Sequence, residues 1–251
     1  MKKILLSVLV FVSVNFVFAQ ENNGPELWIT FKYTPKMGMN QKFETALAEK
    51  TKLYNKPDNA VYTAVLMTGA EAENGKYERI MPRRSNQWFS ETLGTAETKF
   101  WQNNVAKYIQ SGEGPYVWQR IKDLSINFEE PNPTKYFRSL TRVLKNGNNE
   151  NFWRYLERYT KVMRKVRPDI QWGVFILNSG GNTNTVRLLT AFNNPNERQG
   201  ETKNGQAREV YDKMFGEGSW EDDFQKYNEC LVEWSRPTYD FMFRPDLSTK
   251  P

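Results

Sequence analysis

Histidine is absent from this sequence of 251 residues, and cysteine occurs once, at Cys230. Without histidine the chain lacks the base of Ser-His-Asp triads and Cys-His pairs, and the commonest protein ligand of catalytic zinc. A single cysteine excludes an internal disulfide and a thiolate metal cluster. We therefore expect no metal site, and we expect Cys230 to pack as a small apolar side chain.

Long apolar runs are also missing, except at the start of the chain. Lys2 and Lys3 precede an apolar run over 4–14, and Val-Phe-Ala at 17–19 completes the pattern of a secretory signal peptide over residues 1–19. Because polar residues interrupt the run, it is short for a membrane span. We expect an exported, soluble protein without a membrane span after cleavage; the sequence leaves periplasmic or extracellular location open.

The sequence carries only a small excess of positive charge. The formal charge of +6 falls to +4 once Lys2 and Lys3 are removed with the signal peptide. Basic residues are mixed with acidic ones, and no arginine-rich stripe or nucleic-acid motif is present. We therefore expect no nucleic-acid partner. The oligomeric state is left open by the sequence.

The pattern of apolar residues, in contrast, occurs twice in the same order. Each copy has a strand pattern, a helix pattern, two further strands, a second helix and a last strand. Gly- and Asn-rich turns separate the two middle strands of each copy. The expected strands are 26–33, 60–68, 76–81 and 120–128, then 136–144, 170–177, 185–192 and 238–244; the expected helices are 43–54 and 101–108, then 152–166 and 220–227.

The two copies also agree in register. Five pairs of residues of the same kind are separated by 109 positions: Trp28 and Phe137, Lys36 and Lys145, Gly38 and Gly147, Phe43 and Phe152, and Leu47 and Leu156. The second helices match at a separation of 119, and a longer polar loop at 193–206 accounts for the increase. This agreement predicts a tandem duplication.

The pattern predicts an α+β protein with two ferredoxin-like βαββαβ repeats, at 25–130 and 134–246, joined by a proline-containing linker. Strands 60–68 and 170–177 are apolar at nearly every position, so both of their faces should be buried. We therefore expect the repeats to pack sheet to sheet within one chain, as a pseudo-dimeric barrel.

The element order, the Lys-x-Gly turns at Lys36 and Lys145, and the phenylalanine after each turn resemble the dimeric α+β barrel superfamily, which includes antibiotic-biosynthesis-monooxygenase-like and NIPSNAP-like domains. The resemblance implies a cavity that holds flat organic molecules or haem. Its haem-binding members generally use a histidine ligand, which this chain lacks. We therefore expect no cofactor.

Candidate ligand-binding residues lie on the second copy's first strand. Alternation places Tyr136, Arg138 and Arg142 on one face of 136–144. If Arg187 shares that face, the guanidinium groups would bind a carboxylate or phosphate; pairing of each arginine with a strand neighbour is the alternative. Among aromatic residues that could line a pocket, as opposed to packing in the core, we single out Tyr33, Tyr136 and Trp172.

Three functions remain open at this stage. The first is binding of a small aromatic or anionic molecule in a cavity of the barrel. The second, implied by the resemblance alone, is cofactor-independent oxygenation of a flat substrate. The third is a structural or interaction protein whose barrel is filled by side chains.

Overall fold

The computed structural model describes residues 24–69, 72, 75–89, 95–128, 134–194, 204–233 and 235–250. The expected signal peptide at 1–19 and the linker at 129–133 lie outside these residues. The strands are β1 (Leu27–Pro35), β2 (Tyr62–Leu66), β3 (Tyr77–Arg84), β4 (Ile109–Arg120), β5 (Tyr136–Val143), β6 (Gln171–Ser179), β7 (Thr185–Phe192) and β8 (Thr238–Phe243), and the α-helices are α1 (Asn40–Tyr54), α2 (Thr95–Phe100), α3 (Glu150–Val166), α4 (Asn204–Phe215) and α5 (Ser219–Glu229).

The eight strands form one closed antiparallel barrel in the order β1-β3-β2-β8-β5-β7-β6-β4. Within this order the first half runs β4-β1-β3-β2 and the second half runs β8-β5-β7-β6. Backbone pairing of β2 with β8 and of β4 with β6 joins the halves at both edges. The halves therefore face each other across the barrel interior and are also continuous at their edges, which leaves no sheet edge exposed.

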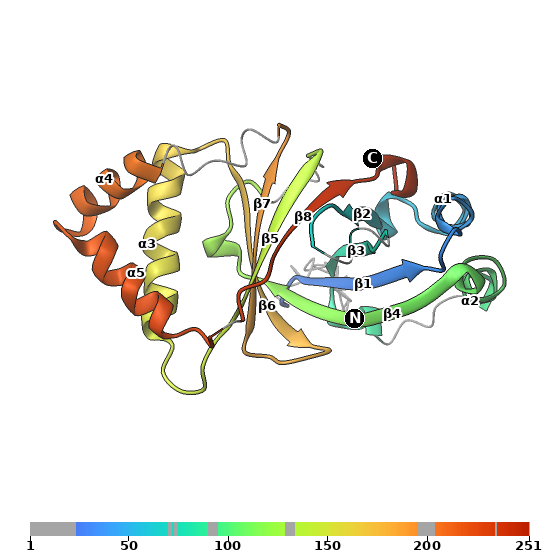
Figure 1. The fold of residues 1–251 in the computed structure, drawn as a ribbon, viewed down its shortest axis with the longest axis horizontal. Coiled ribbons are helices and arrows are strands. Elements are labelled where there is room, and N and C mark those ends of the chain that lie inside the picture. Colours follow the sequence, from blue (N-terminus) through green and yellow to red (C-terminus); the bar gives the residue numbers. More distant parts are fainter. Residues whose placement is uncertain are drawn as a thin grey trace, which may run out of the picture.

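The helices cover the outside of the barrel in two groups. Figure 1 shows α1 and α2 on one side and α3, α4 and α5 on the opposite side. Helix α3 buries Phe152, Tyr155, Leu156 and Met163, whose spacing of three and four residues places them on one face. This face packs against the outer surface of the second half of the barrel.

Strand β4 differs from the expectation. A strand at 120–128 was expected, but β4 ends at Arg120, and residues Lys122–Leu124 form a 3₁₀ turn. The actual strand contains Gly112, Gly114 and Pro115, which weaken the local strand pattern. Pairing with β1 along its whole length, from Leu27–Gln119 to Pro35–Ile109, stabilises a strand that local propensity does not favour.

The second helical regions of the two halves also differ. The expected loop at 193–206 overlaps the start of α4, a helix that was not expected. Its apolar residues Ala207, Val210, Tyr211 and Met214 have helical spacing, so a signal was present. In the first half, α2 continues into a π-helical turn, Trp101–Val105, and a 3₁₀ turn, Ala106–Tyr108.

No helix among the described residues is long and apolar enough to cross a membrane. The buried Cys230 packs in the core beneath α3, as expected for a small apolar side chain.

Candidate functional site

The side chains of β5 point alternately into the barrel and toward the helices that cover it. Arg138 pairs across the sheet with Thr190, and Arg142 with Val186, whereas Arg187 pairs with Thr141. Directly paired residues share a face, and neighbouring residues along a strand alternate between faces. Arg187 therefore lies on the opposite face from Arg138 and Arg142, and the three guanidinium groups do not form the common anion site considered from the sequence.

Arg187 points into the barrel, where it forms a buried ion pair. Its Nη1 and Nη2 donate to the carboxylate oxygens of Glu78 at 2.5 and 2.8 Å, and its Nε donates to Ser139 Oγ at 2.7 Å. The guanidinium lies 5.6 Å from the ring centroid of Trp118. Burial raises the pKa of the Glu78 carboxyl, but the charge and hydrogen bonds of Arg187 outweigh burial and hold this pKa below its usual value. Side chains thus fill this part of the barrel interior.

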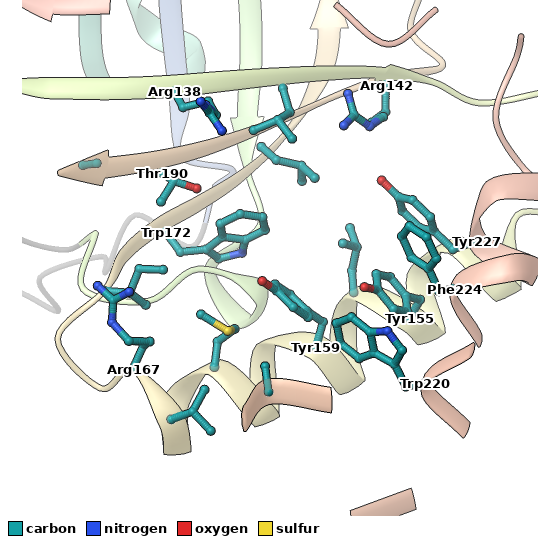
Figure 2. Close-up of a pocket in the computed structure, with 18 of the residues that line it drawn as sticks. Arg138, Arg142, Tyr155, Tyr159, Arg167, Trp172, Thr190, Trp220, Phe224 and Tyr227 are labelled. Atoms are coloured by element: carbon teal, nitrogen blue, oxygen red, sulfur yellow. The ribbon is translucent and has the colours of Figure 1, made fainter. Parts of the chain in front are cut away.

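A cavity of about 440 Å³ lies outside the barrel, between its second half and the helices α3, α4 and α5. This volume is typical of a pocket for a small organic molecule. Figure 2 shows Arg138 and Arg142 along the sheet side, and Tyr155, Tyr159 and Trp220 on the helix side. The aromatic lining residues are Tyr155, Tyr159, Trp172, Phe192, Trp220, Phe224 and Tyr227.

The charged residues that the structure describes in the lining of this cavity are all basic. Arg138 Nε donates to Asp240 Oδ1 at 3.0 Å, and Arg142 donates to the carbonyl of Thr141 at 2.9 Å and also to Tyr227. A guanidinium has five N–H donors, so these contacts engage only part of its capacity. Among the described residues that line the cavity none is a carboxylate, whereas four are arginines: Arg138, Arg142, Arg167 and Arg236.

Trp172 adds a neutral donor to the cavity wall. Its side chain is 7% exposed, and its Nε1 is buried without a hydrogen-bond acceptor in the described part of the chain. Its indole lies near the Tyr159 ring, with 5.9 Å between the centroids (Figure 2). An unpaired buried N–H costs about 1–3 kcal/mol. An acceptor atom on a bound molecule would remove this cost.

The tyrosines of the cavity are neutral at physiological pH. Burial raises the pKa of Tyr155, Tyr159 and Tyr227 above the usual value of a phenol. Each hydroxyl therefore keeps its proton and offers a hydrogen bond as a donor. None of the three acts as a base near pH 7.

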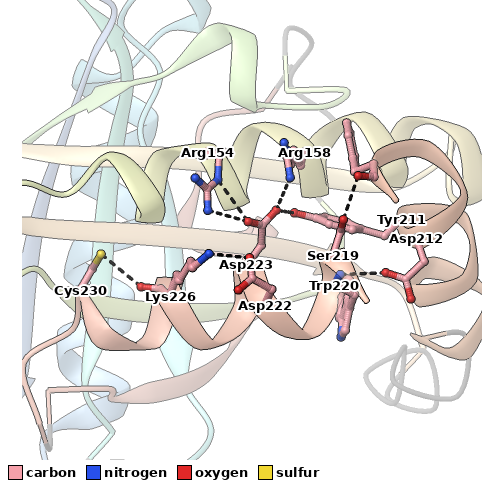
Figure 3. Close-up of polar contacts among 11 residues, drawn as sticks. Arg154, Arg158, Tyr211, Asp212, Ser219, Trp220, Asp222, Asp223, Lys226 and Cys230 are labelled. Atoms are coloured by element: carbon pink, nitrogen blue, oxygen red, sulfur yellow. Dashed lines mark hydrogen bonds and ion pairs between the residues drawn. The ribbon is translucent and has the colours of Figure 1, made fainter. Parts of the chain in front are cut away.

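A buried carboxylate fixes the helices that roof the cavity (Figure 3). Asp223 on α5 accepts hydrogen bonds from Arg154 at 3.1 and 2.7 Å and from Arg158 at 2.6 Å, both on α3. Tyr211 on α4 donates its hydroxyl to the same carboxylate at 2.7 Å. Burial raises the pKa of Asp223, but these hydrogen bonds outweigh it and lower the pKa overall. One side chain thus ties three helices together above the cavity.

A second, smaller cavity of about 310 Å³ opens at one mouth of the barrel. Its walls include Trp28, Tyr62 and Phe137, and its charged lining residues are Asp58, Arg83 and Arg84. The lining of this cavity therefore includes a carboxylate, whereas the described lining of the larger cavity has none.

Of the six candidate ligand-binding residues, the structure brings three into the wall of the larger cavity. Tyr136 stacks on Phe192 with 5.7 Å between the ring centroids and does not line the cavity. Tyr33 lies in the first half of the chain against Trp101, with 5.1 Å between their rings. Arg187 is in the barrel interior. The three that meet are Arg138, Arg142 and Trp172.

The sequence interpretation missed the contribution of α3 to the cavity. Tyr155, Tyr159, Met163 and Arg167 line it from successive turns of this helix or from its end. Their regular spacing of four residues is visible in the sequence and indicates one face of a helix. Local periodicity identifies the inward face of a helix and does not distinguish a filled core from an open cavity.

Neither a protein-family model nor a curated protein sequence matches this chain. Solved structures do share its fold. A protein named "putative monooxygenase" from Lactobacillus acidophilus NCFM has 11% identity and a TM-score of 0.55, over 90% of this chain and 96% of that one. Another with this name, from Fusobacterium nucleatum, has 10% identity and a TM-score of 0.55, over 88% and 93%.

A mutant chlorite dismutase from Candidatus Nitrospira defluvii has 9% identity and a TM-score of 0.52, over 88% of this chain and 92% of that one. At such identities the likeness establishes the fold alone. The chain is therefore an α+β protein with a closed eight-strand antiparallel barrel of the kind seen in these monooxygenase-like and chlorite dismutase-like structures.

Haem is the cofactor that the resemblance to α+β barrel families implies. The chain has no histidine to bind the iron. Tyrosine and methionine bind haem iron in some proteins, and Tyr155, Tyr159, Tyr227 and Met163 line the cavity. The cavity lacks the histidine ligand that the resemblance implies. The described residues also contain no cluster of carboxylate and cysteine side chains suited to a metal ion.

Proposed function

We propose that this protein binds a small planar aromatic carboxylate in the cavity between the second half of the barrel and α3, α4 and α5. One observation carries the proposal: an aromatic cavity of about 440 Å³ has four arginines and an unpaired indole N–H in its wall, with no carboxylate among the described residues that line it. The aromatic rings would contact the faces of a flat ligand. The arginines would bind its carboxylate.

Geometry favours the sheet side for the carboxylate. Arg138 and Arg142 project from the same face of β5, and Trp172 from β6 is in the same wall. Arginine binds carboxylates through charge-assisted hydrogen bonds, which contribute more than neutral ones. The ring system of the ligand would then lie toward Tyr159 and Trp220, whose centroids are 6.0 Å apart.

Binding is favoured over cofactor-independent oxygenation, the second candidate. Where such chemistry removes a proton from the substrate, it needs a base within hydrogen-bond reach of that proton. No carboxylate lines the cavity among the described residues, and burial raises the pKa of Tyr155, Tyr159 and Tyr227. The two solved structures named "putative monooxygenase" share the fold of this chain, and their names are the reason to keep oxygenation as an alternative.

Calorimetric titration with 2-naphthoate and with its uncharged amide, 2-naphthamide, tests the proposal. We expect one 2-naphthoate per chain and weaker binding of the amide. Arg142→Gln should weaken 2-naphthoate about 10- to 100-fold, the equivalent of about 1.5–3 kcal/mol for a hydrogen bond to a charged group, and leave the amide unchanged. Arg208→Gln is the matched control, because Arg208 on α4 is exposed, pairs with Glu221 and does not line the cavity.

Two results would overturn the proposal. The first is equal affinity of wild-type protein for the acid and the amide, or binding of neither. The second is unchanged 2-naphthoate affinity in Ala207→Leu, because Ala207 lines the cavity from α4 and the larger side chain would occupy part of it.

We further propose that the chain arose by tandem duplication and is exported. The common order of four strands in each half supports duplication, as do Glu78 and Arg187, which meet in the barrel and are 109 positions apart, the separation found in the sequence repeat. The pattern at 1–19 supports export. Mass spectrometry of the protein recovered from its host cell would test export, with a mature N-terminus at Gln20 expected and a retained Met1 against it.

A further inference from the structure

The first half of the chain contains a buried guanidinium that forms no ion pair with a carboxylate within the described part of the chain. Arg79 on β3 is 2% exposed. Its Nη2 makes long contacts with Thr51 Oγ1 at 3.3 Å and Asn55 Oδ1 at 3.4 Å, while its Nε and Nη1 have no partner among the described residues. The guanidinium lies 5.8 Å from the ring centroid of Trp101. Buried charges are usually paired, because an unpaired one is strongly destabilising.

A second buried cation lies beside it. Lys50 on α1 is 5% exposed, and its Nζ donates to Asn55 Oδ1 at 2.9 Å. This is the same oxygen that Arg79 contacts, so the two cations are close neighbours. Burial, with the charge of Arg79, lowers the pKa of Lys50 to about 8, and burial lowers the pKa of Arg79 to about 10. Both groups remain protonated at pH 7.

The cations share one carboxylate. Glu97 on α2 forms an ion pair with Lys50 and is the acidic group whose charge acts on Arg79. Tyr33 is the other titratable group near Arg79, and burial raises its pKa to about 12, so it is neutral. Among the described residues, two positive charges therefore face one negative charge in a buried site, which leaves one positive charge unbalanced.

The location of this cluster matches that of the cavity in the second half. Both lie between the outer face of the sheet and the covering helices. Four residues of this cluster correspond to residues that line the cavity. At a separation of 109, Lys50 corresponds to Tyr159, Arg79 to Leu188 and Tyr33 to Arg142, and at a separation of 119 Trp101 corresponds to Trp220. Cationic side chains thus occupy, in the first half, the space that is open in the second.

We propose that Arg79, with Lys50 and Trp101 around it, binds a small monovalent anion, of the size of a halide or formate. The anion would accept hydrogen bonds from Nε and Nη1 of Arg79 and balance the excess positive charge. Trp101 and Tyr33, which lie near Arg79, belong to a packed apolar cluster, and we therefore propose an ion no larger than formate. π-Helical turns are frequent at functional sites. This site is separate from the cavity proposed for the aromatic ligand.

Thermal unfolding of the mature protein tests this site. Sodium bromide would replace sodium gluconate at constant ionic strength, because gluconate is too large for the site. We expect a saturable rise of the melting temperature with bromide in wild-type protein and in Arg208→Gln, and no rise in Arg79→Met. Lys50→Met, which retains Arg79, should weaken the apparent bromide affinity about tenfold or more through loss of one of two buried charges.

A bromide-soaked crystal of wild-type protein gives a second measurement that needs no variant. An anomalous peak within hydrogen-bond distance of Arg79 Nε or Nη1 is expected. Equal melting temperatures in bromide and gluconate, or an anomalous map with bromide at surface positions only, would overturn the proposal. An unchanged response in Arg79→Met would do the same.

Discussion

Replacement of Glu78 by glutamine removes the negative charge from the ion pair inside the barrel while keeping the size of the side chain. Glu78 is 0% exposed and Arg187 is 6% exposed. The carboxylate accepts two hydrogen bonds from the guanidinium, and glutamine offers one acceptor oxygen in their place. Glu78→Gln therefore leaves Arg187 charged and buried without a counter-ion.

The expected cost follows from the burial of both partners. Removing one member of a buried ion pair destabilises a protein by about 3–5 kcal/mol. For a chain of this size that loss corresponds to a melting temperature lower by about 6–20 °C. The pair itself makes a smaller net contribution, because burial of both charges was costly. Glu78→Met combined with Arg187→Met should therefore recover most of the loss.

Exchanging the charges of Glu78 and Arg187 tests more strictly whether the ion pair stabilises the barrel. Ser139 accepts the Nε hydrogen bond of Arg187, and Thr30 hydrogen-bonds Glu78. Thr30 and Ser139 are themselves 109 positions apart, so each member of the pair has a hydroxyl neighbour at the corresponding position. The double variant Glu78→Arg, Arg187→Glu should therefore regain at least half of the stability lost in Glu78→Gln.

Denaturant unfolding followed by circular dichroism measures these differences. The pKa of Glu78 is lowered in the folded state, so its stabilising effect is complete above the usual value of 4.5 and is lost as the pH falls through the lowered value. The difference between wild type and Glu78→Gln should accordingly shrink in acid. A loss below 1 kcal/mol at pH 7, or a charge-exchanged variant no more stable than Glu78→Gln, would refute the reasoning.

Two further predictions concern the helical layers. Asp223→Asn should lower the free energy of unfolding by about 1–3 kcal/mol, because it weakens the hydrogen bonds to Arg154 and Arg158. Hydrogen exchange should accelerate in α4 and α5 and remain slow in the barrel. Uniform acceleration across the chain would contradict the role of Asp223 in holding the helices together. For Lys50, the folded pKa of about 8 lies below the usual 10.5, so the unfolded state binds more protons between these values and stability should rise with pH over this window. In Lys50→Met the free energy of unfolding should rise less with pH, as measured by denaturant unfolding at pH 7, 8, 9 and 10. An equal pH dependence in both proteins would contradict the lowered pKa of Lys50.

The sequence predicted the side-chain faces of β5 correctly, because alternation is a local property of an extended strand. It placed Arg138 and Arg142 together, and the structure has both in one cavity wall. It did not place Arg187, because the face of a residue relative to another strand depends on the register between them, here Thr141 opposite Arg187. A shift of one residue would have reversed the result.

The position of strand β4, in contrast, could not be predicted from the local sequence. Its glycines and Pro115 weaken the local pattern, and a neighbouring segment at 120–128 appeared more strand-like. Long pairing with β1 and closure against β6 determine where the strand lies. Pairing energy between distant segments outweighs local propensity at such a position.

The sequence by itself determined most of the strands and helices and the inward faces of those it located, since these follow from side-chain periods of two and of 3.6 residues along the chain. The tertiary structure decided that the halves join at both edges, that Glu78 meets Arg187, and that the space beneath the helices is open in one half and occupied by Arg79 and Lys50 in the other. These outcomes depend on side-chain volumes and charges brought together from distant positions, which no local pattern records.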